Sequence, residues 1–257
     1  MSYAELHFHL LPGIDDGPSS IAESVALAAA AAAEGTRTIV TTPHVHPSCD
    51  TDVSTLPDRV EEIRARLAAE RIPIEVLCGA ELAHYMVPRL SAVDLETIAQ
   101  GPAGRRWLLL EAPLSGLDAT YTAAADELRE RGFGVVVAHP ERALGADETG
   151  WRAGADETGW RAVEHELAAG SALQINAWSV AGLYGERKRT MALTFLRRAA
   201  RAVIASDAHG GARMPALGLA LDALATEGVG DPRRFVDAGP HALLAHGLAA
   251  RPNFLAA

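Results

Sequence analysis

Short runs of β-branched and aliphatic residues alternate with longer amphipathic stretches along most of the chain. The runs that predict buried strands are Glu5–His9, Thr38–Thr42, Ile74–Cys78, Trp107–Glu111, Gly134–Ala138, Ala172–Ala177 and Ala202–Ala205. Strands that alternate with helices are usually parallel and joined by right-handed crossovers. We therefore expect an α/β fold in which seven strands form a closed βα barrel, with an open doubly wound sheet as the alternative.

The stretches between these runs have the start and stop signals of helices. Ser20-x-x-Glu23 is a capping box that opens a helix over Ile21–Glu34, and Gly35 ends it. Further helices are predicted over Leu56–Arg71, Ala119–Arg131, Ala162–Ala169, Glu186–Ala200, Ala216–Glu227 and Pro240–Gly247. Because there is no Pro/Ser-rich linker and no shift in composition, we expect a single domain over residues 1–257.

One segment of the chain is duplicated. Residues 145–153 (GADETGWRA) recur unchanged as residues 154–162. A nine-residue copy is too short for a solenoid repeat, and it falls in the loop expected after the fifth strand. Because surface loops absorb insertions at small cost, we interpret residues 145–162 as a tandem duplication in that loop. A modified rim of the active-site mouth is the alternative.

Composition and charge narrow the class of protein. The hydrophobic content of 49% suits a globular protein, and the net charge of −10 argues against a nucleic-acid-binding face. The apolar run Val25–Ala33 is too short to span a bilayer, and the first residues do not resemble a secretory signal. Cys49 and Cys78 form no CxxC pair. We expect a reduced, cytoplasmic protein that is not inserted in a membrane.

Histidines and carboxylates gather where the predicted strands end. The set is His7, His9, Asp16, His44, Glu81, Glu111, His139, Asp207 and His209. Side chains alternate along a strand, so His7 and His9 face the same way and can share one metal ion. In βα barrels the carboxyl ends of the strands form the active-site face, and carboxylates gathered there would repel one another without cations. Mixed imidazole and carboxylate ligands suit two or three divalent ions such as Mn, Fe or Zn.

The motifs that carry these residues resemble a known superfamily. The segments LLPGIDDGPSS, TTPHVHP, GAEL, HPER and ALQINA, together with Ser206-Asp-Ala-His209, are similar to PHP (polymerase and histidinol phosphatase) proteins. They are most similar to the PHP protein-tyrosine phosphatases of bacterial capsule and exopolysaccharide operons. The match follows nearly the whole chain in order. It implies a distorted (β/α)7 barrel with its active site at the C-terminal ends of the strands and three divalent metal ions, usually manganese.

The resemblance also implies roles for individual residues. The first metal would be held by His7, His9, Glu81 and Asp207. Glu81 would bridge to a second metal, held also by Glu111 and His139, and the third would be held by Asp16, His44 and His209. Arg142 and Arg213 match arginines that hold the substrate phosphate. The family tends to carry Asp where this chain has Glu5, which we expect to support a ligand histidine. The segment AHGGAR lacks an Asn that often follows the last ligand histidine, which bears on substrate preference.

The implied activity is hydrolysis of phosphotyrosine in the tail of a bacterial tyrosine autokinase. It would use a metal-activated water rather than a thiol, because neither Cys49 nor Cys78 is followed by an arginine at the spacing of thiol phosphatases. A small-molecule phosphatase of the histidinol-phosphate type, or a phosphodiesterase using the same site, is the alternative. A catalytically silent binding module is a third possibility. The sequence leaves the oligomeric state open.

Overall fold

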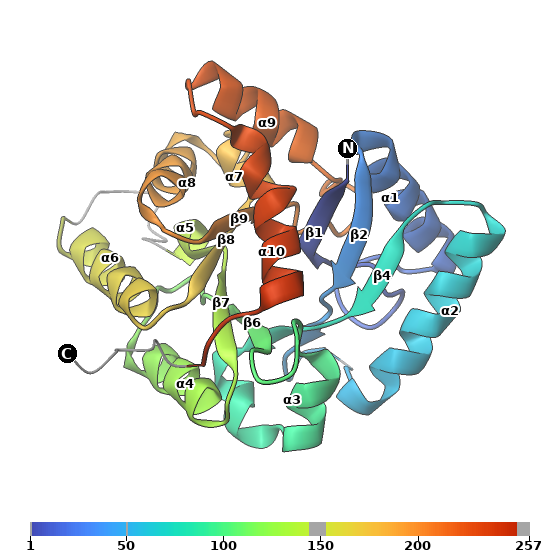
Figure 1. Cartoon of the computed structure of the whole chain (residues 1–257), viewed down its shortest axis with the longest axis horizontal. Helices are drawn as coiled ribbons and strands as arrows, with labels where there is room; N and C mark the ends of the chain where they lie inside the picture. The colour runs from blue at the N-terminus through green and yellow to red at the C-terminus, as the bar shows by residue number, and fades with distance from the viewer. Residues whose placement is uncertain (1, 50, 144–152, 251–257) are drawn as a thin grey trace.

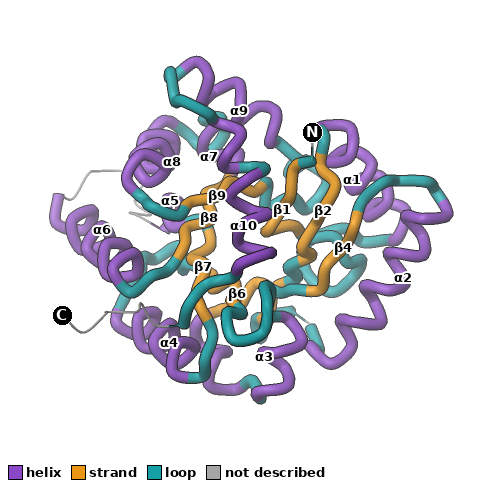
Figure 2. The backbone as a smooth tube through the Cα atoms, in the orientation of Figure 1, coloured by secondary structure: helices purple, strands orange, loops and turns teal. Residues whose placement is uncertain are grey.

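The computed structural model describes residues 2–49, 51–143 and 153–250, without the side chains of residues 153–160. Its strands are β1 (Tyr3–Phe8), β2 (Thr36–Thr41), β3 (His44–Val45), β4 (Glu75–Cys78), β5 (Glu81–Ala83), β6 (Trp107–Glu111), β7 (Gly134–Ala138), β8 (Ala172–Asn176) and β9 (Ala202–Ala205). Every pair among them is parallel. The strands lie in the middle of the molecule and helices surround them (Figures 1 and 2), which confirms the predicted α/β architecture.

The strands form two hydrogen-bonded sheets that continue one another. One has the order β1-β2-β4 and the other β3-β5-β6-β7-β8-β9. Since β3 follows β2 and β5 follows β4 after two residues each, the chain makes the seven passes that the sequence predicts. Between the first and last passes, the described residues show a single parallel bridge, Phe8 to Ala208, with His9 N–H donating to the Ala208 carbonyl at 2.9 Å.

The breaks within the second and third passes have local causes. Pro43 lies between β2 and β3 and has no N–H to donate, so the hydrogen bonding of the second pass is interrupted there. Gly79 separates β4 from β5, and a Cβ at this position would lie only 2.6 Å from Val40 Cγ1 and 3.1 Å from the Thr41 carbonyl oxygen. Only glycine allows so close an approach. At each break the chain changes direction just before a site residue, which is His44 in the second pass and Glu81 in the third.

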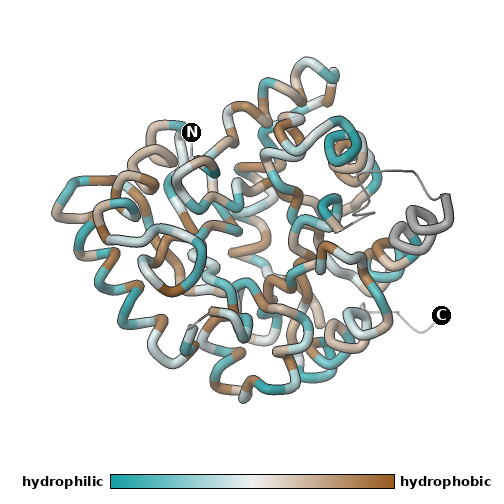
Figure 3. Tube along the Cα trace, turned by 180° about the vertical axis from the view of Figure 1, so that it is seen from behind, coloured by the Kyte–Doolittle hydropathy of each residue, from teal (hydrophilic) through white to brown (hydrophobic). Residues whose placement is uncertain are grey.

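The seven predicted helices are present in order, all but one with small shifts at their ends, and the described residues contain three short helices that were not predicted. They are α1 (Ile21–Glu34), α2 (Leu56–Ala69), α3 (Ala92–Ile98), α4 (Ala119–Glu130), α5 (Pro140–Ala143), α6 (Ala153–Ala168), α7 (Ala177–Val180), α8 (Glu186–Arg198), α9 (Leu217–Thr226) and α10 (Ala238–His246), with short 3-10 turns η1 (Val53–Thr55), η2 (His84–Arg89) and η3 (Pro232–Phe235). Seen from behind (Figure 3), hydrophobic and hydrophilic segments alternate along the outer helices. Within the described residues no helix is long and apolar enough to cross a bilayer.

The duplicated segment departs from its prediction as a loop. The second copy, residues 154–162, has helical backbone and forms much of α6, where only Ala162–Ala169 was expected to be helical. Its Ala, Glu and Arg residues are good helix formers, and the helix continues until the approach to Gly170. Residues 145–152 of the first copy lie outside the described residues, and the single-domain assignment stays a prediction.

The hydrophobic core has two layers. The larger one lies between the strands and the outer helices, and its largest members include Phe8, Tyr121 and Phe195. The smaller one combines side chains from six strands with two that follow η3: Leu6, Val40, Trp107, Leu109, Val136, Ala138, Ala172, Val203, Leu243 and Leu248. Leu243 belongs to α10, which crosses in front of the strands in Figure 1. The Trp107 indole N–H, at the start of β6, donates to the Leu243 carbonyl, so α10 closes the smaller layer at the amino ends of the strands.

Candidate metal centre

The nine histidines and carboxylates singled out in the sequence converge at the carboxyl ends of the strands. Three groups have one donor atom per residue within 4.8 Å of every other, and they overlap. The groups are His7, His9, Glu81 and Asp207; His9, Asp16, His44 and His209; and His44, Glu81 and Glu111. His139 joins them through Nε2, which lies 2.9 Å from Glu81 Oε1. Residues far apart in the chain thus form one continuous cluster.

The first group lies deepest. The Nε2 atoms of His7 and His9 are 3.2 Å apart and face two carboxylates. His7 Nε2 lies 3.0 Å from Glu81 Oε2 and 3.3 Å from Asp207 Oδ1, and His9 Nε2 lies 3.4 Å from each. All four side chains are buried. This is the donor set expected for the first metal.

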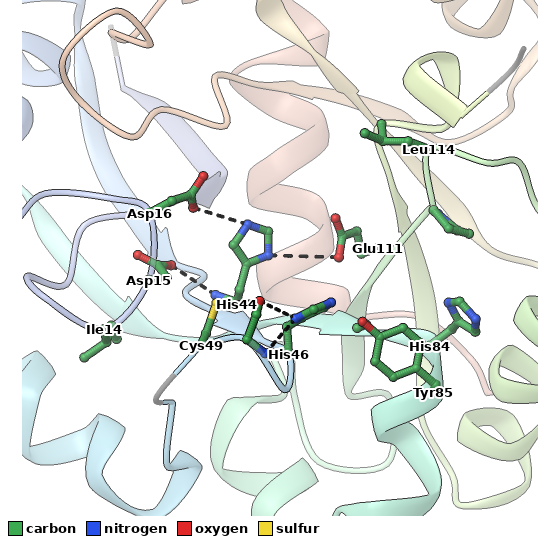
Figure 4. Close-up of a pocket in the computed structure, with 13 residues that line it drawn as sticks. Ile14, Asp15, Asp16, His44, His46, Cys49, His84, Tyr85, Glu111 and Leu114 are labelled. Carbon is green, nitrogen blue, oxygen red and sulfur yellow. Dashed lines mark hydrogen bonds and ion pairs between the residues drawn. The ribbon is translucent and has the colours of Figure 1, made fainter. Parts of the chain in front are cut away.

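The other two groups extend toward solvent and share His44. Its Nδ1 lies 3.1 Å from Glu81 Oε2 and 4.0 Å from Glu111 Oε2, while its Nε2 lies 3.5 Å from Asp16 Oδ1. Figure 4 shows His44 between Asp16 and Glu111. Asp16 Oδ1 is also 3.2 Å from His209 Nε2. The structure thus brings His44 close to both expected outer groups and adds His9 to the one around Asp16.

The backbone at two strand ends adopts an unusual conformation. His139, directly after β7, has φ 35°, and Asp207, shortly after β9, has φ 50°. Residues with a Cβ rarely adopt this left-handed region, and such strain is concentrated at functional sites. At both positions the chain turns sharply from a strand and places the side chain over the cluster.

Three residues that orient the cluster were not predicted from the sequence. Asp15 Oδ2 accepts from His9 Nδ1 at 2.7 Å, and Gln174 Oε1 accepts from His7 Nδ1 at 2.9 Å. Asn176 Nδ2 donates to Asp207 Oδ2 at 2.9 Å. Gln174 and Asn176 alternate on β8, and polar residues two apart in an otherwise apolar buried strand are the signal that could have identified them.

The expectation for Glu5 was wrong. Its carboxylate does not hydrogen-bond a cluster histidine, and instead accepts from the Ser206 backbone N–H at 2.7 Å and from the Ser206 hydroxyl at 2.5 Å. The supporting role for His7 falls to Gln174. Glu5 acts one step further away, because it fixes the residue that precedes Asp207.

The histidines are oriented as metal ligands should be. Nδ1 of His7, His9 and His209 each faces an acceptor, the last being the Asp207 carbonyl at 2.8 Å. A proton held on Nδ1 leaves the Nε2 lone pair free, and in all three rings Nε2 points into the cluster. Glu81 Oε2 is buried and accepts no hydrogen bond from any described group, although imidazole nitrogens surround it. The donor set therefore fits divalent cations.

The carboxylates of the cluster differ in electrostatics. Burial would raise the pKa of Glu81, but the adjacent His7 and His44 hold it well below its ordinary value. Asp207 likewise has a lowered pKa in spite of burial, because His7 and His9 lie beside it. Burial and the charge of Glu81 instead raise the pKa of Glu111 to about 8. Without cations, the negative charges of Glu81 and Asp207 are thus offset by neighbouring imidazoles, whereas Glu111 is held toward its neutral form.

Both predicted arginines lie at the rim of the cluster. Arg142 Nη1 is 2.6 Å from Asp207 Oδ2, and Arg213 Nη2 is 2.5 Å from Asp16 Oδ2. The Arg142 guanidinium also lies 5.2 Å from the centre of the Tyr184 ring. Planar guanidinium groups beside a cation site suit the binding of a phosphate.

Neither cysteine has the environment of a nucleophile. Cys49 is part of the wall of a cavity beside Asp16 and His44, but burial raises the pKa of its thiol. Burial also raises the pKa of Cys78, to about 11. A nucleophilic cysteine needs a lowered pKa, so the structure agrees with the exclusion of a thiol mechanism.

Comparison with known proteins agrees with this site. A family model described as capsular polysaccharide synthesis, CpsB/CapC, matches residues 3–231. The chain is 27% identical over 206 residues to tyrosine-protein phosphatase YwqE of Bacillus subtilis, covering 80% of this chain and 76% of that protein. It is 26% identical over 230 residues to tyrosine-protein phosphatase CpsB of Streptococcus pneumoniae, covering 86% and 89%.

A solved structure from work on YwqE and CpsB, described as unique metal-dependent tyrosine phosphatases, superposes with a TM-score of 0.77. The match has 25% sequence identity and covers 96% of this chain and 98% of the other. Sequence and structure comparisons therefore agree, and the chain belongs to the CpsB/CapC family of capsular polysaccharide synthesis proteins.

Proposed function

We propose that this chain is a metal-dependent protein-tyrosine phosphatase that removes phosphate from the phosphotyrosine tail of a bacterial tyrosine autokinase in capsule or exopolysaccharide synthesis. One observation carries the proposal: three overlapping groups of imidazole and carboxylate donors lie beside two arginines at the carboxyl ends of the strands. The names of the relatives support the reaction, and we place the protein in the cytoplasm, as the sequence predicts.

The proposed cofactor is a set of three divalent metal ions, with manganese first and iron or zinc as the other candidates. The ligands are His7, His9, Asp16, His44, Glu81, Glu111, His139, Asp207 and His209. Mixed nitrogen and oxygen donors without a thiolate support this group of metals. His9, His44 and Glu81 each belong to two of the three donor groups, and of these only Glu81 has two oxygens to offer, so Glu81 is the proposed bridge.

Ions bound here would polarise the phosphate oxygens and lower the pKa of a water nucleophile. Arg142 and Arg213 bind the phosphate oxygens and stabilise the charge that develops on them. Asp15 and Gln174 keep His9 and His7 in the tautomer that directs Nε2 into the cluster. The phenolate of tyrosine, with a pKa of about 10, leaves without a strong acid.

The direct test is turnover by metal-loaded protein of a phosphotyrosine peptide and of histidinol phosphate. The account expects preference for the peptide, and a loss of at least about a hundredfold in kcat/KM for Arg142→Ala and Arg213→Ala. Arg233→Ala, in η3 at the amino end of the strands, is the matched control and should keep full activity. Preference for histidinol phosphate would overturn the proposed substrate. Metal-loaded protein without activity on either compound would overturn the proposal that the chain is an enzyme.

A further inference from the structure

A cavity of about 660 Å³ opens beside the outer donor groups. Asp16, His44 and Glu111 are among the residues that line it, so a phosphate at the cluster would have the cavity as its neighbour. Figure 4 shows Tyr85 and Leu114 on the opposite side of His44 from Asp16. Cavities of this size are typical of small-ligand sites.

The wall on the far side of His44 from Asp16 carries the Tyr85 ring and the Leu114 side chain, beside Glu111 and His84 (Figure 4). Ala83 and Pro113 also line the cavity and add apolar surface. Tyr85 follows β5, which begins with Glu81, and Leu114 follows β6, which ends with Glu111. The strands that carry the proposed ligands Glu81 and Glu111 therefore also lead into this wall, only a few residues further along the chain. Tyr85 is 39% exposed and Leu114 is 52% exposed, so both side chains offer apolar surface to a ligand in the cavity.

Neighbouring side chains hold Tyr85 in place. Its ring meets the rings of His84 and His46 edge-on, at centroid distances of 5.0 and 5.4 Å. His84 Nε2 is 3.2 Å from the Thr120 hydroxyl, and His46 Nδ1 accepts the Ser48 backbone N–H at 3.0 Å. Both imidazoles are anchored, so the aromatic wall is formed before any ligand binds. A preformed wall loses little conformational entropy on binding.

A second aromatic ring near the cluster, that of Tyr184, is already in contact with other side chains. The Arg142 guanidinium and the Lys188 ammonium lie 5.2 and 5.6 Å from the centre of the Tyr184 ring. Trp178 packs on the same ring at 5.8 Å. These contacts suit Tyr184 to orienting Arg142, whereas Tyr85 has its surface available to a ligand.

We propose that Tyr85 and Leu114 bind the aromatic ring of the substrate and make the site specific for aryl phosphate monoesters, phosphotyrosine being the physiological case. The inference rests on the proposed phosphatase activity and adds the residues that select the substrate. A ring placed between the two side chains is removed from water while its phosphate stays at the cluster. An alkyl phosphate lacks the ring and leaves the apolar wall exposed.

The test compares two non-hydrolysable inhibitors, phenylphosphonate and methylphosphonate, during hydrolysis of a phosphotyrosine peptide by metal-loaded protein. Tyr85→Ala and Leu114→Ala should each raise the inhibition constant of phenylphosphonate about tenfold and that of methylphosphonate less than about twofold. Tyr85→Phe keeps the ring and should restore the wild-type value. Leu219→Ala is the matched control, because Leu219 is also 52% exposed but lies on α9 and does not line the cavity.

Equal changes for the two inhibitors, or no change for phenylphosphonate, would overturn the inference and leave the phosphatase proposal intact. A wild-type protein that hydrolyses neither aryl nor alkyl phosphates would overturn both. If Tyr85→Ala does not fold, Leu114→Ala on its own decides the question. Metal content measured for each variant separates a lost contact with the ring from a damaged metal cluster.

Discussion

The carboxyl and amino ends of the same strands bury opposite kinds of side chain. At the carboxyl ends, histidines and carboxylates from β1 and from the segments after β4, β7 and β9 are almost wholly buried. At the amino ends, Trp107 and Leu243 pack in an apolar layer, and the Trp107 indole N–H donates to the Leu243 carbonyl at 3.0 Å. One end is arranged to hold ions and the other to hold the fold together, which is the division expected of a βα barrel.

The largest effect on turnover should come from the polar end. Asp207→Asn keeps the shape of the side chain and its contact with Asn176 but removes a proposed ligand charge. Turnover of a phosphotyrosine peptide per folded molecule should fall at least about a hundredfold. Activity within twofold of wild type would show that this carboxylate holds no essential ion.

The apolar end should give the reverse result. Trp107 is 1% exposed, and Trp107→Ala leaves a cavity that should destabilise the protein by about 3–5 kcal/mol, measured by urea unfolding. Turnover per folded, metal-loaded molecule should stay near that of wild type at temperatures where the variant is folded. If turnover falls as far as in Asp207→Asn, the two ends do not divide stability from chemistry.

Glu5 sharpens the comparison within the polar end. Burial raises its pKa from 4.5 to about 8, whereas imidazoles keep that of Glu81 low. A raised folded-state pKa gives stability that is fully present below pH 4.5 and is lost as the pH rises through 8. Glu5→Gln stays neutral, so unfolding free energies between pH 5 and 8 should fall less steeply than in wild type, by on the order of 3 kcal/mol. Parallel pH profiles would contradict this role of Glu5.

A smaller effect should separate the ligands from the residues that orient them. Gln174→Ala removes the acceptor of the His7 Nδ1 proton without removing a ligand. Metal affinity should fall about 10- to 100-fold, with activity recovered at high metal concentration. Loss of activity that no metal concentration restores would mean that Gln174 does more than orient His7.

The sequence predicted the cluster well because its members share a position, the end of a strand. His7, Glu111 and Asp207 each follow or end an apolar run, and parallel strands bring such residues together whatever their separation in the chain. The seven passes were predictable for the same reason, since β-branched runs alternate with helical patterns.

The partners of these residues were not predictable, because they depend on which strands become neighbours and on the angle at which side chains meet. Glu5 lies two residues before His7, yet it bonds Ser206 from the other end of the chain. Gln174 lies in the segment ALQINA, which the resemblance singled out without giving Gln174 a role, and it accepts the hydrogen bond that fixes His7. The second duplicated copy is helical because it continues α6, a continuation that the loop assignment overlooked.

The measurement that tests the central claim most directly is the metal stoichiometry of the protein after reconstitution with manganese, by mass spectrometry of metal and protein together. The account predicts close to three equivalents in the wild type and fewer in Glu81→Gln, because Glu81 belongs to two donor groups. One equivalent or none in the wild type would contradict a three-ion centre at the carboxyl ends of the strands.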